Sequence, residues 1–222
     1  MKKGWPVLVE FNHAAFFAQR RADLGFVVEG LIRLHWHNTG QPIQGKTAPG
    51  YIECGCLRDR HPFPGDDKFA RSTLAAARAL KDLGGYGLAL DNYPAHVRIA
   101  QEVLDTEGFD CIEVHEGNSV HLLATLPEFK ADVILLDSDS DEGANALAEL
   151  EASRRHWSPQ PVIIVDDIKR GKYDKGKLVL EWATKNQVAW QMVAPHVAAI
   201  GIGDAGRKTV EEWVHWCPLP RR

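Results

Sequence analysis

Between residues 51 and 186, short apolar runs alternate five times with segments of helical periodicity. Each such pair is a β-α unit, and consecutive β-α units build a parallel sheet with helices on both faces. The runs 133–136 and 162–165 are apolar at every position, which is typical of central strands covered on both sides. The expected strands are 51–54, 87–90, 111–115, 133–136 and 162–165, and the expected helices are 70–83, 94–106, 119–126, 142–154 and 176–186.

The alternation ends in two further strands, 188–193 and 197–202, with only three residues between them. A connection this short cannot hold a crossover helix, so the two strands must be antiparallel. A last helix is expected over 208–216. The sequence therefore predicts an α/β fold: a doubly wound, Rossmann-like, mostly parallel seven-stranded sheet with a C-terminal antiparallel hairpin.

The segment before the first strand has a different pattern. Apolar residues recur at helical spacing over 11–18 and again over 24–32, and a polar loop follows as far as Pro49 and Gly50. This divides the chain into an N-terminal helical extension, 1–48, and a main domain, 49–222. The extension could serve as a lid over a bound substrate, as a homodimer interface, or as an additional layer packed on the sheet.

Charge and hydropathy exclude several classes of protein. Lys and Arg number 26 against 30 Asp and Glu, a net charge of −4, whereas nucleic-acid binders usually carry a basic surplus. No apolar run approaches the roughly 18 residues that span a bilayer, and the apolar stretch at 7–9 is too short for a signal peptide. The four cysteines lack zinc-site spacing and fit reduced thiols. We therefore expect a cytoplasmic protein that binds neither nucleic acid nor membrane.

Polar residues stand where the expected strands end. Doubly wound sheets bind their ligands outside the carboxyl ends of the strands, so these residues are the candidates for a functional site. An acid after the second strand commonly receives ribose hydroxyls, although Asp91 could instead cap the helix that begins near Pro94. The strand-end residues are Glu53, Asp91, Asn118, Asp137, Asp166 and Asp167.

Over residues 51–203, this arrangement resembles the class I S-adenosylmethionine-dependent methyltransferases. In that family the first strand runs into an acid-x-Gly-x-Gly loop, and here the corresponding segment, 53–58, reads Glu-Cys-Gly-Cys-Leu-Arg with a single glycine. The segment also lacks the Gly-x-Gly-x-x-Gly pattern of dinucleotide-binding oxidoreductases. The resemblance implies S-adenosylmethionine as the cofactor, with Glu53 and Gly55 near its methionine part.

The same resemblance assigns the other cofactor contacts. It places Asp91 with Asn92 at the ribose, and Asn118 with Ser119 at the adenine. Ser72 and Thr73 either cap the helix expected over 70–83 or bind the cofactor's carboxylate through free amide groups. Asp137 is expected to border the cofactor as well.

Three acids follow the fourth strand at alternate positions, namely Asp137, Asp139 and Asp141. In an extended chain they point to one side, and their mutual repulsion is relieved by solvent or by a bound cation. The fifth strand adds Asp166 and Asp167, and with Asp137 these form an all-oxygen set suited to Mg²⁺. The alternative is a solvated acidic loop in which Asp139 or Asp141 caps the next helix.

An Asp-x-Asp after the fourth strand and an Asp-Asp after the fifth resemble the metal-dependent O-methyltransferases of the macrocin type, which act on sugar hydroxyls. The resemblance implies that Asp137, Asp166 and Asp167 hold the metal and that Asp139 is the catalytic general base. The catechol-type enzymes share the metal but have asparagine at the position of Asp167.

The sequence thus predicts methylation of a small-molecule hydroxyl with the help of Mg²⁺. Three alternatives stay open at this stage. The first is a metal-independent small-molecule methyltransferase, the second a catalytically inactive nucleoside-binding protein of the same fold, and the third a hydrolase that uses the acidic cluster and a metal.

Overall fold

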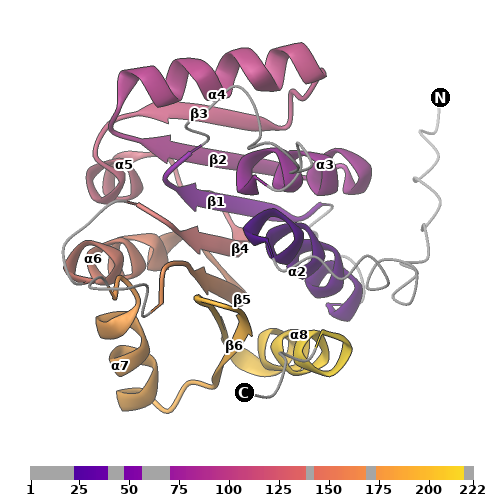
Figure 1. Ribbon diagram of the computed structural model, residues 1–222, viewed down its shortest axis with the longest axis vertical. Coiled ribbons are helices and arrows are strands. Elements are labelled where there is room, and N and C mark those ends of the chain that lie inside the picture. The colour runs from indigo at the N-terminus through magenta and orange to yellow at the C-terminus, as the bar shows by residue number, and fades with distance from the viewer. Residues whose placement is uncertain (1–22, 40–47, 57–70, 139–142, 169–173, 218–222) are drawn as a thin grey trace.

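One sheet of seven strands forms the centre of the computed structural model, in the order β3-β2-β1-β4-β5-β7-β6 (Figure 1). The structure describes residues 23–39, 48–56, 71–138, 143–168 and 174–217. The strands β1 to β5 pair in parallel, and β7 is antiparallel to both β5 and β6. The predicted sheet with its C-terminal hairpin is confirmed. The strands are β1 Gly50–Cys54, β2 Tyr86–Asp91, β3 Ile112–Glu116, β4 Ala131–Leu136, β5 Trp157–Val165, β6 Trp190–Ala194 and β7 Val197–Gly201.

Helices cover both faces of this sheet (Figure 1). Apolar side chains of α2, α3, α4 and α8 form one buried cluster with the sheet, and those of α5, α6 and α7 form the other. None of the described helices combines the length and the apolar character needed to cross a membrane. The helices are α2 Leu24–Asn38, α3 Ser72–Leu83, α4 Pro94–Glu107, α5 Ser119–Thr125, α6 Ala144–Ser153, α7 Lys177–Lys185 and α8 Gly203–Trp216, with a 3₁₀ helix over Arg154–His156.

The central strand β4 shows why its sequence is apolar throughout. Val133 and Leu135 point into the cluster with α2 and α3, whereas Ile134 and Leu136 point into the cluster with α5 and α6. All four side chains are buried, because successive residues of a strand face opposite sides and both sides are covered here.

Most predicted boundaries agree with the structure to within two residues, but α8 and β5 each begin five residues earlier than predicted. The last helix begins at Gly203 rather than at residue 208, because the Gln160 side chain of β5 accepts a hydrogen bond from the Ala205 N–H (2.8 Å) in its first turn. This contact joins residues 45 positions apart, so local periodicity does not reveal it. Strand β6 begins at Trp190, two residues later than predicted. The helix expected over 11–18 lies outside the described residues.

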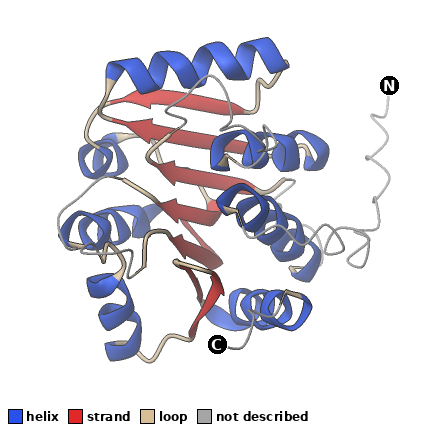
Figure 2. Ribbon diagram, viewed as in Figure 1, coloured by secondary structure: helices blue, strands red, loops and turns tan. Residues whose placement is uncertain are grey.

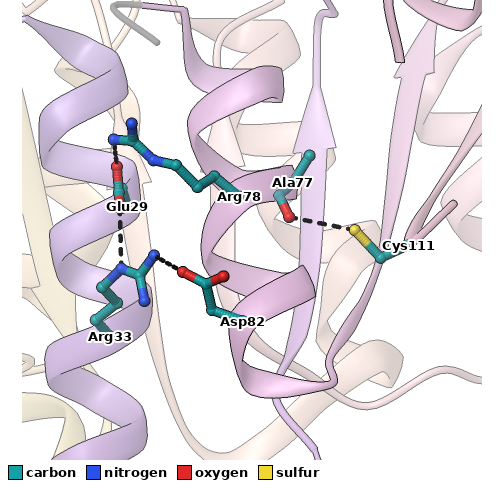
Figure 3. Close-up of polar contacts among 6 residues, drawn as sticks. All are labelled: Glu29, Arg33, Ala77, Arg78, Asp82 and Cys111. Carbon is teal, nitrogen blue, oxygen red and sulfur yellow. Dashed lines mark hydrogen bonds and ion pairs between the residues drawn. The ribbon is translucent and has the colours of Figure 1, made fainter. Parts of the chain in front are cut away.

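Helix α2, which belongs to the predicted N-terminal extension, packs on one face of the sheet between α3 and α8 (Figure 1). Asp23 caps it by accepting a hydrogen bond from the Phe26 N–H (2.7 Å). Glu29 is buried and accepts from Arg33 Nε (2.9 Å) and from Arg78 of α3 (Figure 3). Of the three roles considered for the N-terminal extension, helix α2 therefore has that of an additional layer packed on the sheet. A lid or a dimer interface formed by other parts of 1–48 stays a prediction.

The ion pairs between α2 and α3 differ in burial, and this gives a matched test. We expect Glu29→Gln to lower the free energy of unfolding by about 2–3 kcal/mol, because it leaves two guanidinium groups without their buried partner. Asp82→Asn removes the exposed partner of Arg33 (2.6 Å) and is expected to cost under about 1 kcal/mol. Urea denaturation measures both, and equal losses in the two variants would contradict the buried role of Glu29.

Candidate active site

The parallel strands end at one edge of the sheet, where their arrows meet the loops (Figure 2). Hydrogen bonds between neighbouring strands continue one residue past the strand ends. The Gly55 N–H donates to Leu90 O (2.8 Å), the Asp137 N–H donates to Cys54 O (2.9 Å), and the Asp166 N–H donates to Leu136 O (3.2 Å). These bonds hold the residues that follow β1, β4 and β5 beside one another.

Gly55 turns the chain away from β1 in a conformation that favours glycine. Its φ is 93°, and a Cβ at this position would lie 2.6 Å from the carbonyl oxygen of Asp137. The close approach brings the β1 turn against the start of the loop after β4. The buried Cys56 follows Gly55, and Leu57, at the second glycine position of the family loop, lies outside the described residues.

Glu53 lies fully buried on β1, facing the first turn of α3. The Ser72 hydroxyl donates a hydrogen bond to its Oε1, while Oε2 has no hydrogen-bond partner among the described residues. Burial raises the pKa of Glu53 to about 8, against the hydrogen bonds from the Ser72 and Thr73 hydroxyls, which lower it. A buried polar oxygen without a partner needs an explanation, and a ligand bound at the end of β1 would supply one.

The same contact corrects one expectation. Capping of α3 by Ser72 is wrong, because its hydroxyl is used on Glu53 and the N-cap position belongs to Arg71, which makes no side-chain capping bond. Binding of the cofactor's carboxylate by Ser72 and Thr73 stays a prediction.

The raised pKa of Glu53 predicts a pH dependence of stability. Between the ordinary value of 4.5 and about 8, the folded chain holds a proton that the unfolded chain has released, so the free energy of unfolding falls as the pH rises through this range. We expect Glu53→Gln to flatten part of this fall, since glutamine has no proton to release. Urea denaturation across this pH range measures it, and the same slope in both proteins would contradict the buried protonated state.

Asp91 ends β2 with a carboxylate that is already oriented. Its Oδ1 accepts from the Tyr93 N–H (2.8 Å), and its Oδ2 accepts from the Cys56 N–H (3.1 Å) and lies 3.3 Å from His96 Nδ1. Each carboxylate oxygen can accept about two hydrogen bonds, so Oδ1 keeps capacity for a ligand hydroxyl. Asn92 is exposed beside it. His96 was not predicted; its place in the first turn of α4 is the one local signal for it.

Asn118 and Ser119 follow β3 but face different surroundings. Asn118 caps α5 by accepting from the His121 N–H (3.0 Å), and it is exposed, so its amide is accessible to a ligand. Ser119 is buried, and its hydroxyl donates to Glu149 of α6. The predicted contacts of both residues with adenine stay predictions.

A buried polar network that the sequence did not reveal is centred on Glu149. Besides Ser119, the Asn145 amide donates to its Oε1 (3.1 Å) and also to Ser138 Oγ (2.7 Å). Burial raises the pKa of Glu149, and its Oε2 has no hydrogen-bond partner within the described ranges. The network ties the start of α5 to the loop after β4, one residue before Asp139.

The structure brings together the three residues predicted to hold a metal. Asp137, Asp166 and Asp167 are half-buried, and each offers a carboxylate oxygen within 4.8 Å of the others. Asp167 has a φ of 56°, a conformation uncommon for a residue other than glycine. Asp139 and Asp141 lie outside the described residues. Three carboxylates this close form a donor set that fits Mg²⁺, which binds through few protein carboxylates and keeps several waters.

Lys175, which the sequence analysis did not single out, lies against this acidic cluster. Its Nζ is 2.8 Å from Asp167 Oδ2 and 3.6 Å from Asp137 Oδ1, and the residue is 7% exposed. It precedes α7 and is separated in sequence from every strand end, so neither periodicity nor the strand-end pattern indicates it.

Comparisons with known proteins agree with this fold. A family model described as a methyltransferase domain matches residues 71–168. No curated protein matches the chain in sequence. Among solved structures, the O-methyltransferase from Bacillus cereus in complex with SAH is 19% identical, with a TM-score of 0.59 over 86% of this chain and 87% of that one.

Two further structures have the same fold. The O-methyltransferase TomG from Streptomyces achromogenes, in complex with SAM, is 14% identical with a TM-score of 0.55 over 80% of this chain and 78% of its own. A methyltransferase from Geobacter sulfurreducens is 16% identical with a TM-score of 0.55, over 86% and 88%. The sheet order is that of the fold shared with these methyltransferase structures, and the matched methyltransferase domain lies within it.

Proposed function

We propose that this chain is a class I S-adenosylmethionine-dependent methyltransferase, which transfers the methyl group of S-adenosylmethionine to a hydroxyl oxygen of a small molecule with the help of a divalent cation. The observation that carries the proposal is the cluster of Asp137, Asp166 and Asp167, whose oxygens lie within 4.8 Å of one another. It adjoins the Gly55 turn, where the methyl donor is expected. Two of the structures compared above are described as O-methyltransferases, which supports oxygen as the acceptor atom.

The residues after β1 and β2 suit the methyl donor. Gly55 lets the backbone approach closely, and the Glu53 oxygen that has no partner among the described residues would offer a polar contact at the end of β1. Asp91 would receive the ribose hydroxyls, because its carboxylate is oriented by two backbone N–H groups and retains acceptor capacity. Asn118 would contact the adenine from the start of α5.

The residues after β4 and β5 suit the acceptor. Asp137, Asp166 and Asp167 would hold the cation through carboxylate oxygens, and Asp139 would take the proton from the acceptor hydroxyl as general base. When bound, the donor supplies an electrophilic methyl group and the cation lowers the pKa of a hydroxyl. The Ser138–Asn145–Glu149 contacts fix the residue next to Asp139, so they would orient the loop that carries the base.

A second candidate is methyl transfer without a metal. The observation that favours it is Lys175, whose ammonium group already neutralises part of the acidic cluster. In that case Asp137 and Asp139 would be polar residues of the acceptor pocket.

Methyl transfer to a panel of phenolic and sugar hydroxyl compounds separates the two candidates. The purified chain is assayed with S-adenosylmethionine after treatment with a chelator, and again after addition of Mg²⁺. We expect transfer to depend on Mg²⁺. Equal transfer under both conditions would favour the metal-independent enzyme, and transfer to none of the hydroxyl compounds would contradict O-methylation.

A further inference from the structure

We propose that Lys175 competes with the divalent cation for the acidic cluster, so that metal binding requires the lysine side chain to leave Asp137 and Asp167. The inference rests on the proposed function, since it concerns the metal site named there. It adds a residue that controls access of the metal to its carboxylates.

The contacts of Lys175 are those of a cation in a binding site. Its Nζ lies 2.8 Å from an oxygen of Asp167 and 3.6 Å from an oxygen of Asp137, which are two of the three carboxylates proposed to hold the metal. The residue is 7% exposed, whereas lysine is almost never buried unless it is paired. Its ammonium group therefore approaches the carboxylate oxygens that the metal would use.

The backbone around Lys175 is closely packed on both sides. A Cβ at Gly143, before α6, would lie 2.6 Å from the carbonyl oxygen of Lys175, and φ of Gly143 is 88°. A Cβ at Gly176 would overlap Cδ1 of Ile168, which follows the acidic pair at the end of β5. These close approaches hold the main chain of Lys175 beside the cluster, so rotation of its flexible side chain is the simplest way for the ammonium group to leave.

Electrostatic repulsion explains why the ammonium group of Lys175 and the divalent metal ion exclude each other. The three carboxylates bring a charge of about −3, of which Lys175 neutralises one unit, so the cluster is partly compensated before a metal arrives. A divalent ion bound to Asp167 would lie close to an ammonium group on the same carboxylate, and like charges at this distance repel strongly in a half-buried site. Rotation of the Lys175 side chain into solvent removes this repulsion and leaves the carboxylates of Asp137 and Asp167 free to bind the metal.

The test is calorimetric titration of the full chain with MnCl₂ after chelator treatment, comparing wild type with Lys175→Met. We expect the variant to bind one Mn²⁺ at least about tenfold more tightly, because one unit of positive charge has left the site. Lys177→Met is the matched control: it removes the same charge from an exposed position two residues away, and its affinity is expected to equal that of wild type.

The outcomes separate the two claims. If wild type binds Mn²⁺ and Lys175→Met binds it no more tightly, the competition is refuted while the metal site stands. If neither protein binds Mn²⁺, the metal part of the proposed function fails, and the competition fails with it.

A second measurement uses wild type alone and does not depend on the folding of a variant. Reductive methylation with mass-spectrometric readout is expected to leave Lys175 largely unmodified without metal and to modify it at saturating Mn²⁺, while the exposed Lys177 reacts equally under both conditions. Protection of Lys175 that is unchanged by saturating Mn²⁺ would overturn the proposal.

Discussion

Asp91→Ala is expected to weaken the binding of S-adenosylhomocysteine by at least about a hundredfold, since two hydrogen bonds from ribose hydroxyls to a carboxylate are each worth about 1.5–3 kcal/mol. The carboxylate is held in place before the ligand arrives, by the N–H groups of Tyr93 and Cys56 at 2.8 and 3.1 Å. Little ordering remains for the ligand to induce, so most of this energy contributes to affinity. Isothermal calorimetry measures the difference.

The control for Asp91→Ala is Asp110→Ala. Asp110 is an exposed aspartate just before β3, at the opposite end of the strands, and its removal changes the net charge equally. Thermal denaturation of both variants shows whether the loss of the two backbone contacts of Asp91 has unfolded the chain. A folded Asp91→Ala protein that binds S-adenosylhomocysteine like wild type would remove Asp91 from the cofactor site.

Asp139→Asn is expected to reduce methyl transfer by about 10²- to 10⁴-fold, the contribution typical of a general base, and to leave the affinity for S-adenosylhomocysteine nearly unchanged. Asparagine has a similar shape but cannot take a proton from the acceptor hydroxyl. The separation of the two effects distinguishes a base from a residue that binds the donor. Single-turnover transfer and calorimetry on the same preparation measure both quantities.

Asp141→Asn is the matched control for the base, because it makes the same change two residues further along the loop. It is expected to retain most of the turnover. Full turnover in Asp139→Asn would assign the proton transfer to another group, and a parallel loss in both variants would indicate a general electrostatic effect of the loop.

The fold could be predicted well because its signals are local and repeated. The apolar runs of β4 and β5 are buried at almost every position toward their carboxyl ends, and the short gap before β7 permits only an antiparallel pair. The start of α8 could not be predicted, because the Gln160 side chain that satisfies its first turn comes from β5. Long-range contacts of this kind leave no periodic trace in the sequence.

The sequence predicts only those site residues that directly follow the carboxyl end of a strand. That rule points to Asp137, Asp166 and Asp167, which the structure does bring together. Lys175 and Glu149 follow no strand, and each enters the site through packing of α6 and α7 at the same edge of the sheet. Their roles depend on which carboxylates they meet, and only the folded chain shows this.

The central claim is that the carboxyl edge of this sheet binds an adenosyl methyl donor. Calorimetric titration of the wild-type chain with S-adenosylhomocysteine, together with thermal denaturation in its presence, tests this claim most directly. Saturation at one molecule per chain with a raised melting temperature is the predicted result. No measurable binding heat and an unchanged melting temperature would contradict it.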